Sequence, residues 1–212
     1  MSGGDFDPGK VRALLFDLGG VVFEFDFVHA LACWAPMSAL SRAELHKAFA
    51  HDEDYERHER GELSSAQYFD TLRRKLQLGE ATDAQIEAGW NAIFRDEIGT
   101  TLDLIEAARK RWPCYAFSNT NRSHHAHWRA AYPRIEPAFD KVFASSDIGM
   151  RKPERESFEH VCREIGLPAQ AVLFFDDLQV NVAGARAAGL QAVQVRSPDD
   201  VRNALEELRQ SD

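Results

Sequence analysis

Residues 11–22 read VRALLFDLGGVV and join a short apolar run to an acidic side chain, Asp17, and two glycines. A run of this length that is apolar at nearly every position is typical of a strand buried on both faces of a parallel sheet. The glycines directly after it indicate a turn. The segment therefore predicts a central strand that presents a carboxyl group at its carboxyl end.

Similar short apolar runs recur further along the chain, at 114–119, 142–145, 171–177 and 191–196. Amphipathic segments of helical length lie between or after them, at 101–111, 122–131, 154–165, 180–188 and 199–209. Strands that alternate with helices in this way form βαβ units. The sequence predicts an α/β protein with a Rossmann-like, doubly wound parallel sheet.

Residues 27–98 interrupt this alternation. They contain no convincing strand run, but helical periodicity is present at 42–50, 65–76 and 83–94. An all-helical block after the first strand is too long for a single crossover connection. We therefore expect an α/β core made of residues 10–26 and 99–212, with residues 27–98 forming a helical cap over one end of the sheet.

Charge and composition exclude several classes of partner. The 212 residues carry 25 Lys+Arg against 34 Asp+Glu, a net charge of −9, which argues against nucleic acid or an anionic membrane surface. No apolar run approaches the roughly 20 residues of a membrane span, and the first ten residues lack the apolar stretch of a signal peptide. Three scattered cysteines are typical of free thiols. We expect a soluble cytoplasmic protein with a small-molecule ligand; the oligomeric state stays open.

Polar side chains follow the predicted strands. In an open parallel sheet, ligands bind outside the carboxyl ends of the strands. One edge of the sheet is thereby expected to collect three carboxylates, a hydroxyl, an amide and an ammonium group, from Asp17, Ser118, Asn119, Lys152, Asp176 and Asp177.

Phosphoryl transfer through a carboxylate requires such a set. Asp17 could attack phosphorus and form an aspartyl-phosphate, which divides hydrolysis into two easier steps. The paired acids after the 171–177 run could hold Mg²⁺, a cation that prefers oxygen ligands. Lys152 and Ser118 would stabilise charge on the phosphoryl oxygens. Gly19 and Gly20 would let the backbone approach the phosphoryl group and offer N–H donors.

Four motifs in this order carry a family resemblance: FDLGGVV, FSNTNR, GMRKPE and FFDD-x-x-x-N. They resemble the signature motifs of the haloacid dehalogenase-like (HAD) hydrolases, and the helical insert resembles their type 1 cap. The resemblance extends over residues 11–196. More closely, DLGGVV, the cap segment HERGE (58–62), and SNTNR followed by His124 are similar to bacterial α-D-glucose-1-phosphate phosphatases.

The resemblance implies roles for individual residues. Asp17 would be the nucleophile, Ser118 and Asn119 would contact the phosphoryl group, and Lys152 would neutralise its charge. A family member of this kind hydrolyses a small phosphorylated metabolite, here a sugar phosphate such as α-D-glucose 1-phosphate.

The resemblance also implies a Mg²⁺ cofactor. Its ligands would be Asp17, the Gly19 carbonyl and Asp177. Asp176 would either support the site from behind or serve as an alternative ligand, and the sequence leaves both readings open.

Gly19 departs from the usual family pattern, which has a second Asp two residues after the nucleophile. That Asp acts as proton donor and base, an effect commonly worth about 10²–10⁴-fold in rate. An anomeric hydroxyl is a better leaving group than an ordinary alcohol, so we hypothesise a site suited to activated leaving groups. Asp26, Glu24 or a metal-bound water would be a partial substitute.

Other side chains have weaker functional interpretations. Six residues of the predicted cap could line a sugar pocket, although ordinary packing explains most of them: Trp34, Tyr55, His58, Glu59, Arg60 and Trp90. Asn181 belongs either to the site or to a helix start. The histidines at 124, 125 and 127 lack the spacing of a zinc site.

Three alternatives to a phosphatase remain. A 2-haloacid dehalogenase also lacks the second acid, but it needs no metal and the Asp176–Asp177 pair counts against it. A sugar phosphomutase would pass the phosphoryl group to a second sugar. A catalytically weak protein of this fold would only bind phosphorylated ligands.

Overall fold

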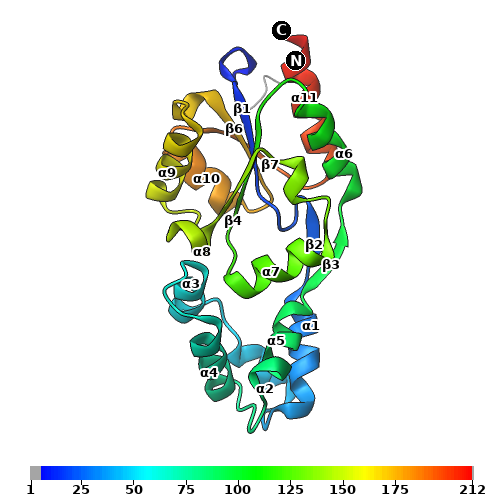
Figure 1. The fold of residues 1–212 in the computed structure, drawn as a ribbon, viewed down its shortest axis with the longest axis vertical. Helices are drawn as coiled ribbons and strands as arrows, with labels where there is room; N and C mark the ends of the chain where they lie inside the picture. The colour runs from blue at the N-terminus through cyan, green and yellow to red at the C-terminus, as the bar shows by residue number, and fades with distance from the viewer. Residues whose placement is uncertain (1–5, 212) are drawn as a thin grey trace.

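The computed structural model describes residues 6–211. At its centre lies a five-stranded parallel sheet with the order β5–β4–β1–β6–β7 (Figure 1). The strands match the five predicted runs: β1 (Ala13–Phe16), β4 (Cys114–Ser118), β5 (Lys141–Ala144), β6 (Val172–Asp176) and β7 (Gln191–Gln194). The predicted doubly wound α/β fold is confirmed.

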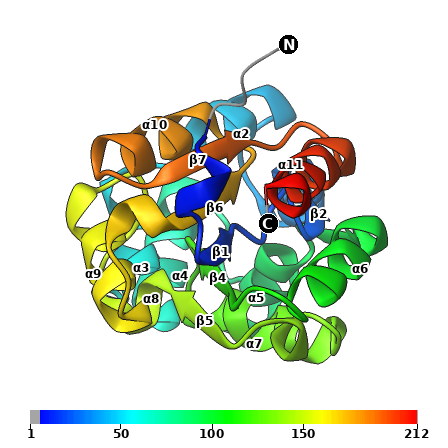
Figure 2. The same cartoon turned by 90° about the horizontal axis from the view of Figure 1, so that it is seen from above.

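Helices cover both faces of this sheet, with α9 and α10 on one side and α6 and α11 on the other (Figure 2). Successive side chains of a strand point to opposite faces, so Leu14 and Phe16 of β1 join one apolar cluster and Leu15 joins the other. This explains why β1 is apolar throughout. The helices are α6 (Gly99–Ala108), α7 (Arg122–Ala131), α8 (Ser145–Ile148), α9 (Arg155–Ile165), α10 (Gln179–Ala187) and α11 (Pro198–Gln210).

The chain also contains a helical insert, which we define as residues 27–91 and which has an apolar cluster separate from the two on the sheet. Its helices are α1 (Phe27–Trp34), α2 (Arg42–Ala48), α3 (Glu53–Glu59), α4 (Ser65–Lys75) and α5 (Asp83–Asn91). They pack around a core of their own that contains Trp34 and Trp90, both fully buried. The insert lies beyond the carboxyl ends of the parallel strands, at the end of the molecule opposite α11 (Figure 1).

An antiparallel ribbon joins the insert to the sheet. Strand β2 (Phe23–Phe25) enters the insert and pairs with β3 (Phe94–Glu97), which leaves it. The prediction that residues 27–98 contain no strand is therefore wrong at β3, and the helix predicted over 83–94 ends at Asn91. The sequence of β3, FRDE, is half exposed and lacks the apolar run that identifies a buried strand.

No helix among residues 6–211 combines the length and apolar character needed to cross a membrane. All three cysteines are free: Cys33 is exposed, whereas Cys114 and Cys162 are buried. Burial raises the pKa of the Cys114 thiol to about 12 and that of Cys162 to about 11, so both are neutral packing groups.

Candidate active site

The carboxyl ends of β1, β4 and β6 converge on a cavity of about 150 Å³ beneath the helical insert. Its lining includes six of the predicted site residues: Asp17, Gly19, Ser118, Asn119, Lys152 and Asp177. Ser118 is buried at the last position of β4, and Asp17 follows β1 directly. Asp176 and Gly20, the two other predicted residues, are not among the lining residues: Asp176 is fully buried and Gly20 is half-buried.

Lys152 is the charge centre of the site. Its Nζ lies 2.8 Å from Asp17 Oδ1 and 2.7 Å from Asp176 Oδ2, and its side chain is 1% exposed. The rings of Phe117 and Phe174 lie 5.5 and 5.4 Å from the ammonium group. Burial by itself would lower the pKa of Lys152, but the two carboxylates raise it above its usual value. The lysine is therefore held as a cation beside Asp17.

Asp176 is fully buried, and both of its carboxylate oxygens are engaged within the protein. Oδ1 accepts from the backbone N–H of Leu178 at 2.9 Å, and the Asn181 amide donates to Oδ1 and Oδ2 at 3.0 and 3.1 Å. Oδ2 also accepts from Lys152. Asn181, which the sequence left undecided, thus orients the carboxylate that holds Lys152.

Three carboxylates are crowded together at the cavity. Oxygens of Asp17, Asp176 and Asp177 all lie within 4.8 Å of one another. Burial raises the pKa of Asp17 to about 8, although the Lys152 ammonium opposes that rise. Burial and the charge of Asp176 raise the pKa of Asp177 to about 6. A divalent cation would relieve this repulsion, and an all-oxygen donor set suits Mg²⁺, so the residues present fit the predicted metal.

Asn119 fixes the backbone of the lysine loop. Its Nδ2 donates to the Lys152 carbonyl at 2.9 Å, and its Oδ1 accepts from the Lys152 N–H at 2.8 Å. This two-way contact sets the position from which the lysine side chain reaches Asp17. Asn119 also lines the cavity, beside Ser118.

The two glycines after Asp17 differ from each other. Gly20 has φ +71°, and a Cβ there would lie 2.5 Å from Asp177 Oδ2, so glycine permits this close approach. Its N–H donates to the Phe23 carbonyl at 2.8 Å, which corrects the prediction that this N–H binds the phosphoryl group. At Gly19, a Cβ would lie 2.8 Å from Phe25 Cε1. The aromatic ring thus lies where a side chain at position 19 would begin.

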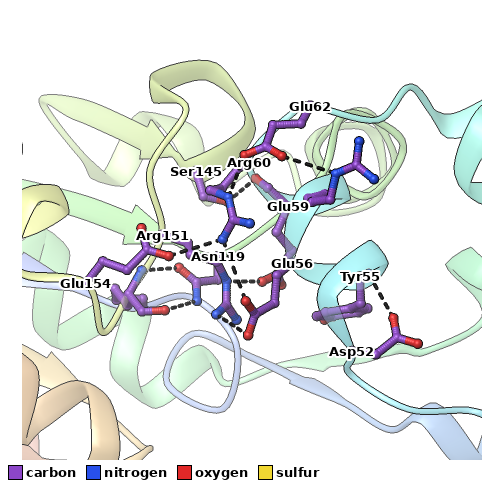
Figure 3. A network of polar contacts seen from close by, with 12 residues as sticks. Asp52, Tyr55, Glu56, Glu59, Arg60, Glu62, Asn119, Ser145, Arg151 and Glu154 are labelled. Carbon is purple, nitrogen blue, oxygen red and sulfur yellow. Dashed lines mark hydrogen bonds and ion pairs between the residues drawn. The ribbon is translucent and has the colours of Figure 1, made fainter.

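A polar network joins helix α3 of the insert to the loop that carries Lys152 (Figure 3). Arg151 Nε lies 2.9 Å from Glu59 Oε2, and its Nη1 lies 3.1 Å from Glu56 Oε1. Arg60 extends the network to Glu154 at 3.1 Å. Along the sequence, only its place before Lys152 distinguishes Arg151 from other charged residues.

A buried hydroxyl makes a further link between insert and sheet. Ser145 Oγ donates to the Glu59 carbonyl at 2.7 Å and accepts from the Thr120 N–H at 2.8 Å. Next to it, Gly61 packs so closely on the Ser146 carbonyl that a Cβ would lie 2.5 Å from that oxygen. Helix α3 therefore docks directly on the segment after β5.

The residues predicted to form a sugar pocket separate into two groups. Tyr55 and Glu59 line the cavity. The others lie elsewhere: Trp34, His58 and Trp90 are buried in the insert, and Arg60 belongs to the ion-pair network.

The remaining polar candidates are engaged or distant. His124 lines the cavity, but one ring nitrogen lies 3.0 Å from the Asn121 amide and the other 3.0 Å from the Trp90 carbonyl. Neither Glu24 nor Asp26, the hypothesised substitutes for a proton donor, is among the residues that line the cavity. Asp26 instead caps α1 by accepting from the Val28 N–H at 2.9 Å.

Comparison with known proteins identifies relatives along the whole chain. Drimenol cyclase drtB of Aspergillus calidoustus is 30% identical over 202 residues, which cover 92% of this chain and 36% of the cyclase, so the chain spans about a third of that relative. Sesquiterpene phosphatase astK of Aspergillus oryzae is 28% identical over 94% of this chain and 95% of its own length. The D-ribitol-5-phosphate phosphatase of Bacteroides thetaiotaomicron is 22% identical over 92% of this chain and 97% of its own.

A solved structure agrees with the fold. The HAD family enzyme bt-2542 of Bacteroides thetaiotaomicron, in complex with magnesium and inorganic phosphate, superposes with a TM-score of 0.78 at 27% identity. The match covers 88% of this chain and 94% of that one. Residues 11–189 also match the model of the haloacid dehalogenase-like hydrolases. The predicted superfamily is confirmed, and the chain belongs to the haloacid dehalogenase-like hydrolases.

Proposed function

We propose that the protein is a Mg²⁺-dependent phosphatase that hydrolyses small phosphate monoesters through an aspartyl-phosphate at Asp17. The observation that carries the proposal is the contact of the Lys152 ammonium with both Asp17 and the fully buried Asp176. It keeps a cation beside the candidate nucleophile, at the edge of the sheet where Asp177 adds a further carboxylate. Two relatives that are named as phosphatases, the sesquiterpene phosphatase and the D-ribitol-5-phosphate phosphatase, support the same reaction.

The reaction has two displacements at phosphorus. An Asp17 oxygen attacks the phosphorus atom, the ester P–O bond breaks, and the leaving alkoxide takes up a proton from solvent water. A second water then attacks the phosphorus of the acyl phosphate, the bond between phosphorus and the Asp17 oxygen breaks, and inorganic phosphate and the Asp17 carboxylate are released. Lys152, Ser118 and Asn119 would stabilise the negative oxygens during both displacements.

The metal would be held by Asp17, the Gly19 carbonyl and Asp177. When bound, Mg²⁺ supplies positive charge that offsets the negative phosphoryl oxygens. Asp176 has both oxygens engaged with Lys152, Asn181 and a backbone N–H, so we assign it to holding Lys152 and not to the ion. The magnesium and phosphate bound by bt-2542 support this cofactor.

Residues 27–98 are proposed to act as a type 1 cap on a core of residues 10–26 and 99–212. Support comes from the docking of α3 beside the Lys152 loop and from the insert residues that line the cavity. A cap over the site limits the water that reaches the aspartyl-phosphate.

A sugar phosphate such as α-D-glucose 1-phosphate is the substrate class suggested by the sequence, and a relative that acts on D-ribitol 5-phosphate supports a polyol. A relative named as a sesquiterpene phosphatase supports an apolar alcohol instead. The groups around Asp17 act on the phosphoryl group and not on the alcohol. Phosphatase activity can therefore be tested with a substrate whose alcohol is not the natural one.

The test is release of inorganic phosphate from 4-nitrophenyl phosphate, with Mg²⁺ and with a chelator. We expect turnover that requires Mg²⁺ and is lost in Asp17→Asn, which keeps the shape of the side chain. Equal rates for the two proteins would favour a phosphate-binding protein without activity. Halide release from a 2-haloacid that persists with the chelator would identify a dehalogenase, and transfer of phosphate to an added sugar would identify a mutase.

A further inference from the structure

The cavity has an apolar side. Besides the charged residues at Asp17, six large apolar side chains line it: Phe23, Phe25, Phe27, Ile93, Phe94 and Leu178. They come from the β2–β3 ribbon, from the residues flanking that ribbon and from the loop after β6. An alcohol group attached to a phosphoryl group at Asp17 would therefore have aromatic and aliphatic neighbours.

Several polar side chains in the same lining are already paired with protein groups. Glu59 binds Arg151, and Tyr55 hydrogen-bonds with Glu59. His124 has both ring nitrogens engaged, and Asn181 is held by Asp176. A sugar with several hydroxyl groups would have to compete for these partners, because a buried hydroxyl without a hydrogen bond is costly.

The exposed large hydrophobic side chains among residues 6–211 are Phe25 (40% exposed), Val28 (53%), Leu178 (49%) and Val180 (58%). Of these four, Phe25 and Leu178 line the cavity. Exposed apolar groups that gather at a site entrance are typical of a surface that contacts a ligand.

A groove continues from the cavity along the insert. The two share Phe25, Phe27 and His51. The groove is lined further by four apolar and two polar side chains: Val28, Leu31, Phe49, Ala50, Asp26 and His46. The path from Asp17 past the ring of Phe25 to helix α1 is thus bordered mainly by apolar side chains. Phe25 lies beside Gly19, so an apolar wall stands next to the position where related phosphatases usually have a proton donor.

We propose that the substrate is the phosphate monoester of an extended apolar alcohol, whose hydrocarbon chain leaves the cavity past Phe25 and lies in the groove along α1. The proposal rests on the proposed phosphatase function and specifies its leaving group. The groove and the cavity are continuous, so a hydrocarbon chain attached to a phosphoryl group at Asp17 can extend into the groove. We therefore assign the groove to the substrate's own chain.

The first experiment measures kcat/KM for ethyl, butyl, hexyl and octyl phosphate, with α-D-glucose 1-phosphate as the polar comparison. A fully buried methylene strengthens binding about fourfold. We expect octyl phosphate to exceed ethyl phosphate at least tenfold in kcat/KM, mainly through KM, because the two alcohols are equivalent leaving groups. Octyl phosphate should also have a lower KM than glucose 1-phosphate, whose better leaving group favours its kcat.

A matched pair of variants locates the chain. Val28 and Val180 are each the second residue of a helix and are similarly exposed, but Val28 lines the groove and Val180 lines neither groove nor cavity. Val28→Ser should lower the octyl-to-ethyl ratio of kcat/KM about threefold or more. Val180→Ser should leave the activity and the ratio as in the wild type.

Failure of this proposal differs from failure of the proposed function. Turnover of 4-nitrophenyl phosphate together with kcat/KM values that are independent of chain length, or a lower KM for glucose 1-phosphate than for octyl phosphate, would overturn the apolar substrate and leave the phosphatase standing. Equal effects of the two serine variants would overturn the path along α1. Absence of Mg²⁺-dependent turnover for every ester would overturn both proposals.

Discussion

Arg151 Nε lies 2.9 Å from Glu59 Oε2, so the residue directly before the site lysine is ion-paired with a buried carboxylate of the helical insert (Figure 3). The pair ties the position of α3 to the position of the Lys152 loop. Burial raises the pKa of Glu59, and Arg151 is the leading influence that lowers it again. This contact therefore couples the stability of the insert to the geometry of the site.

Replacement of Arg151 by Ala should lower the free energy of unfolding by about 3 kcal/mol, because Glu59 would be left as an unpaired buried charge. Urea unfolding followed by tryptophan fluorescence measures the change. Arg57→Ala is the control, since its partners Asp54 and Glu62 are 33% and 47% exposed and such solvent-accessible pairs contribute less than about 1 kcal/mol. Equal losses in the two variants would contradict a special role for the Arg151–Glu59 pair.

The adjacent acids Asp176 and Asp177 should respond differently to amide substitution. Asp177→Asn removes a proposed metal ligand, so the Mg²⁺ concentration for half-maximal activity should rise at least about tenfold. Asp176→Asn weakens the hold on Lys152, so kcat should fall while the Mg²⁺ requirement changes little. Activity titrated with Mg²⁺ distinguishes the two, and the reverse pattern would make Asp176 the ligand.

Gly20→Ala should disturb Asp177 as well as the backbone. Gly20 and Gly166 have φ of +71° and +79°, but a Cβ would meet Asp177 Oδ2 at 2.5 Å in the first case and nothing within 4 Å in the second. Both substitutions should destabilise by about 1 kcal/mol through backbone strain. Only Gly20→Ala should also weaken Mg²⁺ activation, and similar Mg²⁺ curves for both variants would show that the Asp177 contact is unimportant.

Acid should destabilise the protein partly through His58. Neither ring nitrogen of this buried histidine has a hydrogen-bond partner, and burial lowers its pKa from 6.5 to about 4. Between these values the unfolded chain binds a proton that the folded protein excludes, so stability falls as the pH falls, by about 1.4 kcal/mol per unit. At pH values well above 6.5 both states are neutral and the effect vanishes.

His58→Phe keeps an aromatic ring for the stack on Tyr68, whose ring centroid lies 4.4 Å away, and removes the titration. Urea unfolding at pH 7 and pH 4.5 should give a stability loss about 2 kcal/mol smaller in this variant than in the wild type. His46→Gln, at an exposed position of α2, serves as the control. An unchanged pH dependence in His58→Phe would rule out His58 as a source of acid sensitivity.

The sequence predicted the parts of the molecule that depend on strong local signals. The five parallel strands are apolar on both faces, and such runs are short, continuous and bounded by polar residues. Parallel strands bring their carboxyl ends together, and this topology is why Asp17, Lys152 and Asp177 could be expected at one cavity.

The sequence could not predict contacts that depend on how the insert docks. The ion pair of Arg151 with Glu59 joins residues 92 positions apart, and both look like ordinary surface charges along the chain. The ribbon of β2 and β3 lacks an apolar run because much of it is exposed.

The sequence also could not decide whether Asp176 or Asp177 faces the cavity. That depends on the turn after β6, in which the Leu178 N–H and the Asn181 amide donate hydrogen bonds to Asp176 and leave Asp177 to line the cavity.

The β2–β3 ribbon has an evolutionary consequence. Strands β2 and β3 pair with each other, so the chain between Phe25 and Phe94 leaves the sheet and returns to it at one covalent junction. A foreign helical module could be grafted there without altering any crossover of the parallel sheet. Such a module would also have to supply a partner for Arg151, because Glu59 of the present insert binds the residue next to Lys152.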